Sequence, residues 1–101
     1  MDKYAEIRKK ALPLLKPYIS RMAVFGSTVR GETTKESDID LLIRLKPSNA
    51  RPKLGFFKLM EIEEDLQKNL GCEVDLVTED SLSPYIRPYV DKDKVIIYEE
   101  G

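Results

Sequence analysis

Residues 24–43 read V-F-G-S-T-V-R-G-E-T-T-K-E-S-D-I-D-L-L-I, and this stretch decides both the fold and the chemistry of the chain. A Gly-Ser pair at 26–27 ends one apolar run, and two aspartates open the next. Because side chains alternate between the two faces of a strand, Asp38 and Asp40 are expected on the same face. Two neighbouring carboxylates repel each other unless a cation lies between them, which favours a divalent metal.

The Gly26-Ser27 pair predicts a phosphate-binding turn. Such a turn offers backbone N–H groups and a hydroxyl to an anion. Gly26 would allow close approach of the backbone, and Ser27 is expected to contact a β- or γ-phosphate. Taken alone, the pair is better explained by an ordinary strand-to-helix turn, where glycine and serine are frequent. Next to the carboxylate pair, it indicates a metal–nucleotide site.

The bulk composition limits the alternatives. A chain of 101 residues is long enough for one domain with one modest core, so we treat 1–101 as a single domain. The net charge is −1, from 17 basic and 18 acidic side chains, and it gives no reason to expect independent nucleic-acid binding. The sequence shows no membrane-spanning stretch, no signal-peptide pattern and one cysteine, Cys72, which together favour the cytoplasm.

Histidine is absent from the sequence. Its absence excludes histidine-based nucleophile triads and histidine-ligated zinc sites. Acid–base and metal chemistry must therefore come from other side chains, with carboxylates the most numerous candidates. Hard oxygen ligands suit magnesium or manganese.

Periodicity and turn signals predict alternating helices and strands. Gly71 is expected to end the longest helix, and the residues after Ser83-Pro84 are expected to begin a short helix that bends at Pro88. The full set comprises helices at 2–16 and 54–70, a helical turn at 28–32, and strands at 21–25, 38–45, 73–78 and 94–98. This order is typical of a compact α/β or α+β domain in which helices flank a small mixed β-sheet. The strand order is not readable from one sequence.

The strings G-S-x-x-R-G at 26–31 and S-D-I-D-L-L-I at 37–43 resemble the signature of the DNA polymerase beta-like nucleotidyltransferases. Within that superfamily they are most similar to the minimal nucleotidyltransferases. The resemblance covers nearly the whole chain, including the leading helix, the V-D-L-V string at 74–77 and the closing strand. Minimal nucleotidyltransferases are known mainly as antitoxins of prokaryotic toxin–antitoxin pairs whose toxins are helical HEPN-domain ribonucleases.

The resemblance implies a role for each matching residue. Asp38 and Asp40 would hold Mg²⁺, with Mn²⁺ also possible. Asp75 would complete a second metal site and help to deprotonate the acceptor hydroxyl, although a solvent-facing aspartate on an edge strand is an ordinary alternative. Glu73 is the local rival of Asp75, since an offset of two places it on the same face of a strand. Arg30 either contacts phosphate or braces the loop through an acidic partner.

The resemblance further implies a magnesium-dependent enzyme that transfers AMP from ATP to a tyrosine of a cognate HEPN toxin and so silences its ribonuclease. The chain carries no module of its own for gripping nucleic acid, so a protein partner is expected to bring the acceptor. The main alternative is a non-catalytic, nucleotide-binding antitoxin that neutralises the toxin by occlusion. An antibiotic-modifying adenylyltransferase is a third option, although such enzymes usually need added helical surface.

Two aromatic pairs have no assigned chemistry. Phe56 and Phe57 are expected in the core or on a partner surface. Tyr85 and Tyr89 are four residues apart and are expected to pack along one helical face, with a partner contact as the second interpretation.

Overall fold

The computed structural model describes residues 3–26 and 39–100. The elements in these ranges are the helices α1 (Lys3–Leu15), α3 (Phe56–Leu70) and α4 (Arg87–Asp93), the strands β1 (Ile19–Phe25), β2 (Ile39–Leu45), β3 (Val74–Thr78) and β4 (Val95–Glu99), and the short 3-10 helices η1 (Ser48–Ala50) and η2 (Glu79–Ser81). The strands form one sheet in the order β3-β2-β1-β4. β1 is antiparallel to both β2 and β4, whereas β2 and β3 are parallel. The predicted fold, a small mixed sheet flanked by helices, is confirmed.

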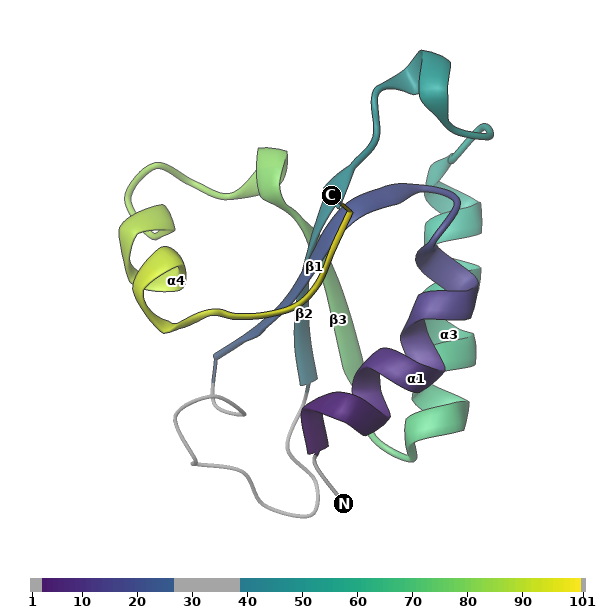
Figure 1. Ribbon diagram of the computed structural model, residues 1–101, viewed down its shortest axis with the longest axis horizontal. Helices are drawn as coiled ribbons and strands as arrows, with labels where there is room; N and C mark the ends of the chain where they lie inside the picture. The colour runs from purple at the N-terminus through teal and green to yellow at the C-terminus, as the bar shows by residue number, and fades with distance from the viewer. Residues whose placement is uncertain (1–2, 27–38, 101) are drawn as a thin grey trace.

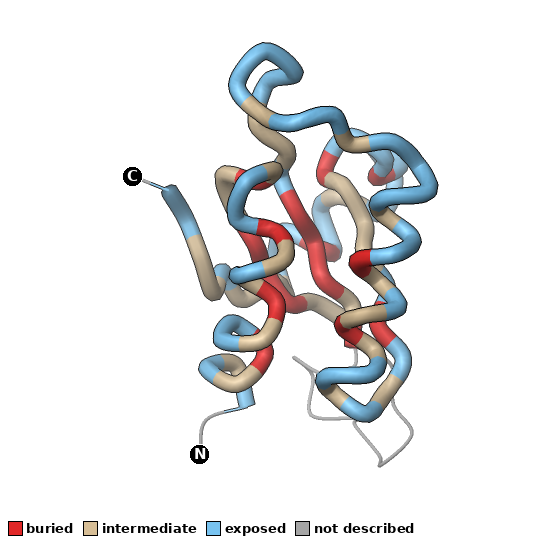
Figure 2. The backbone as a smooth tube through the Cα atoms, turned by 90° about the vertical axis from the view of Figure 1, so that its right-hand side faces the viewer, coloured by how far each residue is buried: buried red, intermediate tan, exposed pale blue. Residues whose placement is uncertain are grey.

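The sheet is covered on both faces, with α1 and α3 on one side and α4 on the other (Figure 1). The larger core lies between the sheet and α1–α3, and Figure 2 shows buried segments running through the central strands. Its fully buried larger side chains are Ile7, Leu15, Ile19, Met22, Val24, Leu41, Ile43, Ile62, Leu66 and Val74. A smaller cluster beneath α4 joins Ala23 and Leu42 to Leu82 and Val90. Burial on both faces explains the continuous apolar runs at 22–25 in β1 and 41–43 in β2.

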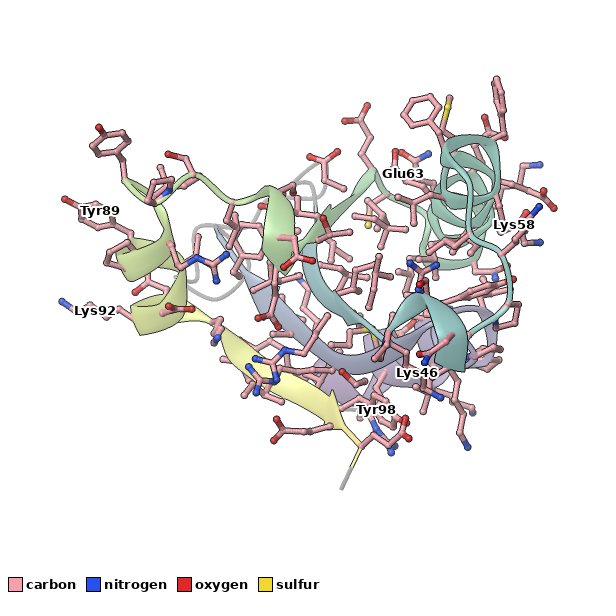
Figure 3. All side chains as sticks on the ribbon, turned by 90° about the horizontal axis from the view of Figure 1, so that it is seen from above. Lys46, Lys58, Glu63, Tyr89, Lys92 and Tyr98 are labelled. Atoms are coloured by element: carbon pink, nitrogen blue, oxygen red, sulfur yellow. The ribbon has the colours of Figure 1, made fainter. Side chains whose placement is uncertain are left out.

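Strand β3 lies at one edge of the sheet, and side chains of α3 cover part of that edge. The backbone N–H of Leu76 donates to Glu63 Oε2 at 3.2 Å, and that of Val74 donates to Gln67 Oε1 at 3.4 Å. Glu63 extends from α3 toward β3 in Figure 3. Edge N–H groups that are satisfied in this way do not offer a template for pairing with another chain.

The predicted bounds of the long elements agree with the structure to within two residues. As expected, α3 ends at Gly71, whose φ of 72° is left-handed and whose N–H donates to Gln67 O. The predicted turn at 28–32 lies outside the described residues. No helix in the described part of the chain is long and apolar enough to cross a membrane.

The helix expected after Ser83-Pro84 was placed wrongly. Residues 84–86 form a turn, in which the N–H groups of Ile86 and Arg87 donate to Ser83 O at 3.1 and 3.0 Å. The helix begins only at Arg87, so Pro88 lies in its first turn instead of bending its middle. A proline in the first turn costs no helical hydrogen bond, because the N–H groups there have no intrahelical partner. Pro84 and Pro88 can each mark the first turn of a helix, and the sequence did not show which of them does so.

Candidate active site

Asp40 and Asp75 are direct partners across the parallel strands β2 and β3. Neighbouring strands of a sheet lie about 4.8 Å apart, so the two carboxylates are held side by side. Asp40 is half-buried and Asp75 is exposed. Along each strand the residue two positions further on, Leu42 or Val77, packs in the cluster beneath α4. The period of two therefore places both carboxylates on the α4 face of the sheet.

Gly26 closes this arrangement from the end of β1. Phe25, the last residue of β1, is paired with Asp40, and Gly26 follows it with a φ of 78°. A Cβ at Gly26 would overlap the Asp40 carboxylate oxygen Oδ2. Glycine is favoured here because the backbone conformation is left-handed, and a larger residue would also have to displace the Asp40 carboxylate. We use the name carboxylate end for Gly26, Asp40 and Asp75 together.

The structure thus brings together three of the six residues predicted to form the site. Ser27, Arg30 and Asp38 lie outside the described residues, and their roles stay predictions. Within the described ranges no group of three or more histidine, cysteine or acidic side chains is arranged to hold a metal ion, and the third expected carboxylate, Asp38, falls outside them. The donor set of the carboxylate end still fits magnesium, because it consists of adjacent hard carboxylate oxygens whose mutual repulsion a cation would relieve.

Glu73, the rival of Asp75, differs from it in position. It precedes the first residue of β3 and borders a hollow with Glu64, Gln67 and Lys68 at the end of α3. Its carbonyl accepts the Ile39 N–H at 2.8 Å, so its backbone helps to join β3 to β2. Asp75, and not Glu73, is therefore the register partner of Asp40.

The opposite end of the same sheet face is closed by charges of both signs. Glu79 is buried, with Oε2 3.7 Å from Arg21 Nη1 and Oε1 3.4 Å from Arg44 Nη2. The Glu79 carbonyl accepts a hydrogen bond from Arg87 in the first turn of α4. Arg21 also donates to Glu99 at 2.9 Å. This set of residues, which we call the ionic end, ties the start of α4 to the sheet.

A hollow of about 180 Å³ adjoins the carboxylate end between β1 and α4. Phe25, Gly26, Tyr89, Val90 and Asp93 line it. Apart from Gly26, sequence reasoning assigned none of these residues to the site. Nothing in the sequence places α4 beside the end of β1, because that proximity depends on the strand order.

The aromatic pairs are more exposed than expected. Tyr85 and Tyr89 are 85% and 72% exposed, so the prediction that they pack against the domain was wrong. Phe56 and Phe57 are 73% and 84% exposed and contact each other edge to face, with ring centroids 6.0 Å apart. Their placement in the core is excluded, and their role as a partner surface stays a prediction.

Comparison with known proteins gives the family to which this fold belongs. The nucleotidyltransferase domain model matches residues 1–98, and the chain belongs to that family. The protein adenylyltransferase MntA of Thermococcus cleftensis is 38% identical over 79 residues, which cover 78% of this chain and 75% of the relative. A relative in Methanocaldococcus jannaschii is 34% identical over 100 residues, covering 96% of this chain and 97% of its own.

Among solved structures, a toxin–antitoxin crystal structure with AMP-PNP superposes with a TM-score of 0.74 at 25% identity. The superposition covers 97% of this chain and 74% of that one. The similarity therefore extends over nearly the whole domain and is not limited to the aspartate motif.

Proposed function

We propose that this chain transfers AMP from ATP to a tyrosine hydroxyl of a HEPN-domain ribonuclease toxin and thereby acts as its antitoxin. One observation carries the proposal: Asp40 and Asp75 are register partners beside Gly26, whose backbone is left-handed and whose missing side chain leaves space for the Asp40 carboxylate. The names of the relatives support it, since one is a protein adenylyltransferase and a solved neighbour is a toxin–antitoxin pair with an ATP analogue. The HEPN acceptor comes from the sequence resemblance.

In this proposal each residue has a separate task. Gly26 provides the left-handed turn at the end of β1 that brings the backbone close to the triphosphate, and Ser27 donates its hydroxyl to a phosphate oxygen. Asp38, Asp40 and Asp75 would hold magnesium, which when bound neutralises charge on the triphosphate. Asp75, exposed at the edge strand, accepts the proton of the incoming hydroxyl. The hydroxyl oxygen bonds to the α-phosphorus as the bond to the bridging oxygen breaks, and pyrophosphate leaves.

The acceptor is brought by the partner. The net charge of −1 gives the chain no field that would attract nucleic acid. Docking of a partner that presents its tyrosine beside Asp75 would supply the positioning on which most of the rate depends. AMP added to the toxin brings bulk and negative charge to its surface.

The direct test is incubation of this protein and its HEPN partner with magnesium and ATP labelled at the α-phosphate. We expect label on a tyrosine of the partner, a mass increase of one or a few adenylates, and loss of ribonuclease activity. Intact-mass spectrometry of the partner measures the modification. A partner that is inhibited stoichiometrically but unmodified would support occlusion instead, and label on RNA would overturn the protein acceptor.

A further inference from the structure

Two side chains of α3 accept hydrogen bonds from the strand that carries Asp75. Glu63 Oε2 accepts the Leu76 N–H at 3.2 Å, and Gln67 Oε1 accepts the Val74 N–H at 3.4 Å. Val74 and Leu76 are the residues that flank Asp75 in β3. The two hydrogen bonds therefore hold the backbone on both sides of the carboxylate that the proposed function places at the acceptor hydroxyl.

The spacing of a helix beside a strand makes this arrangement possible. Glu63 and Gln67 are four residues apart, so they lie on one face of α3, about 6 Å from each other along the helix axis. The N–H groups of Val74 and Leu76 point the same way and are about 6.6 Å apart along the strand. Because the earlier helix position bonds to the later strand position, α3 runs antiparallel to β3.

The other side of β3 is bonded to β2. The Glu73 carbonyl accepts the Ile39 N–H, so Asp75, two residues further on, also directs its backbone groups toward β2. The N–H groups of its two neighbours point to the open edge, because β3 is the first strand in the order β3-β2-β1-β4. Without the α3 acceptors they would bond only to water, and an edge segment held from one side opens more readily than a central strand.

Glu63 is the stronger of the two acceptors, because a carboxylate forms a charge-assisted hydrogen bond and its distance is the shorter one. Among the described residues Glu63 has no ion-pair partner. The hollow that it borders is otherwise lined by apolar side chains, those of Phe56, Leu59, Met60 and Leu76. A half-buried carboxylate in such surroundings is costly unless its oxygens accept hydrogen bonds, and the Leu76 N–H supplies one.

We propose that Glu63 is a positioning residue for AMP transfer. Through the Leu76 N–H it fixes the edge strand, so that the Asp75 carboxylate stays in register with Asp40. Gln67 assists from the other side of Asp75. The assignment deepens the proposed function and rests on it. Such support matters for the rate, because a displacement of about 1 Å in a reacting group can lower a rate about a hundredfold.

The test compares Glu63→Met, which removes the acceptor, with Glu63→Gln, which keeps an oxygen in the same place. Hydrogen exchange of the Leu76 amide, followed by NMR without nucleotide, reports the bond itself. We expect Glu63→Met to speed this exchange about tenfold, the usual effect of losing one charge-assisted hydrogen bond, and Glu63→Gln to stay close to the wild type.

Transfer to the partner is measured with magnesium and α-labelled ATP, well below the melting temperature. Glu63→Met should lower kcat about tenfold, as the loss of a supporting hydrogen bond at a site usually does. KM for ATP should stay within about twofold, because the phosphate turn does not depend on β3. Glu63→Gln should retain most of the wild-type kcat.

Glu64→Met is the matched control. Glu64 is the next residue of α3, but it is exposed and borders a different hollow. It should leave both the Leu76 exchange and the transfer rate unchanged. In an Asp75→Asn background, Glu63→Met should have no further effect on transfer, because a residue that acts through Asp75 loses its effect once Asp75 is replaced. A residue that only stabilised the fold would lower the rate in both backgrounds.

The outcomes separate this inference from the proposed function. If the wild type transfers AMP and Glu63→Met keeps its kcat while the Leu76 amide exchanges faster, the bond only protects the edge and the positioning role is overturned. Equal losses of kcat in Glu63→Met and Glu63→Gln would also overturn it, because the effect would then come from the charge. If the wild type transfers no AMP to the partner, the proposed function fails and the positioning role fails with it.

Discussion

The two ends of the sheet face beneath α4 are built on the same strands and carry opposite chemistry. At the carboxylate end, Asp40 and Asp75 place two like charges side by side. Arg44 and Glu79, each four residues after one of these aspartates, form an ion pair at the ionic end. Between the two ends, the face is apolar and packs against Leu82 and Val90.

The two ends differ in how their charges are paired within the fold. At the ionic end a buried acid lies between two arginines, so charge is matched within the fold. At the carboxylate end, Asp75 is exposed and takes part in none of the ion pairs that join described residues. Adjacent carboxylates repel each other, and the proposed function assigns a cation to this end of the sheet face.

The largest expected effect comes from neutralising the carboxylate end. Asp40→Asn or Asp75→Asn should each lower the rate of AMP transfer about a thousandfold, which corresponds to about 4 kcal/mol of lost transition-state stabilisation. The free energy of unfolding should stay equal or rise slightly, because the repulsion between like charges is relieved. Transfer is measured with α-labelled ATP and stability by urea denaturation of the same preparations.

Glu73→Gln is the matched control for Asp75→Asn, since the two positions are close in sequence but only Asp75 is paired with Asp40. Its transfer rate should stay within a few-fold of the wild type. A ranking in which Glu73→Gln loses more activity than Asp75→Asn would assign the third carboxylate to Glu73.

Comparison of two glycines separates the cost of backbone strain from the cost of displacing the Asp40 carboxylate at the carboxylate end. Gly26 and Gly71 have nearly equal left-handed φ values of 78° and 72°. A Cβ at Gly71 would meet nothing within 4 Å, whereas one at Gly26 would overlap the Asp40 carboxylate. Gly71→Ala should therefore cost about 1 kcal/mol of stability from strain alone and leave transfer unchanged.

Gly26→Ala should cost about 2–3 kcal/mol, because displacement of the Asp40 carboxylate is added to the same strain. It should also lower magnesium-dependent ATP binding, which calorimetry measures alongside the denaturation midpoint. Equal losses of stability in both variants, with ATP binding intact, would show that Gly26 serves only the turn.

The ionic end is tested by two glutamates that share Arg21. Glu79 is buried, while the side chain of Glu99 is 51% exposed and pairs with Arg21 at 2.9 Å. Glu79→Gln should lower the free energy of unfolding by about 1–2 kcal/mol, because the largely buried Arg21 guanidinium loses one of its two carboxylate partners. Glu99→Gln should cost less than about 0.5 kcal/mol, since solvent screens exposed pairs.

Transfer activity should survive both substitutions when it is measured well below the melting temperature. A loss of activity in Glu79→Gln without a loss of stability would contradict the division of the sheet face, because the ionic end would then act on the site through α4.

The local elements and part of the site were predictable, and their arrangement was not. The positions of Gly26 and Asp40 followed from the alternation of apolar runs and from the motif spacing. The pairing of Asp75 with Asp40 required the family resemblance, because a sequence does not state which strands are neighbours. For the same reason, the sequence did not predict that Glu79 pairs with Arg21 or that Tyr89 and Phe25 line the same hollow. Contacts between distant segments depend on the order β3-β2-β1-β4, which composition and periodicity do not encode.

The smallest expected effect concerns the end of α4 that lies beside the carboxylate end. Asp91 Oδ1 accepts a hydrogen bond from Lys94 Nζ at 2.9 Å, and this bond is the main cause that lowers the pKa of Asp91 below its ordinary value of 3.8. A carboxylate whose pKa is lower in the folded state adds stability above its unfolded pKa and loses it as the pH falls through the folded pKa. Asp91→Asn should therefore lower the melting temperature slightly at pH 7.

That difference should shrink below pH 3.8 and vanish once the wild-type carboxyl is protonated in the folded state as well. Melting curves by circular dichroism between pH 2 and 7 measure it. In a Lys94→Met background, Asp91→Asn should have no further effect, because its hydrogen-bond donor is gone. The exposed Asp91 should matter less than the buried Glu79, because burial sets how strongly a charge pair acts. A pH-independent loss in Asp91→Asn would instead assign its contribution to packing at the end of α4.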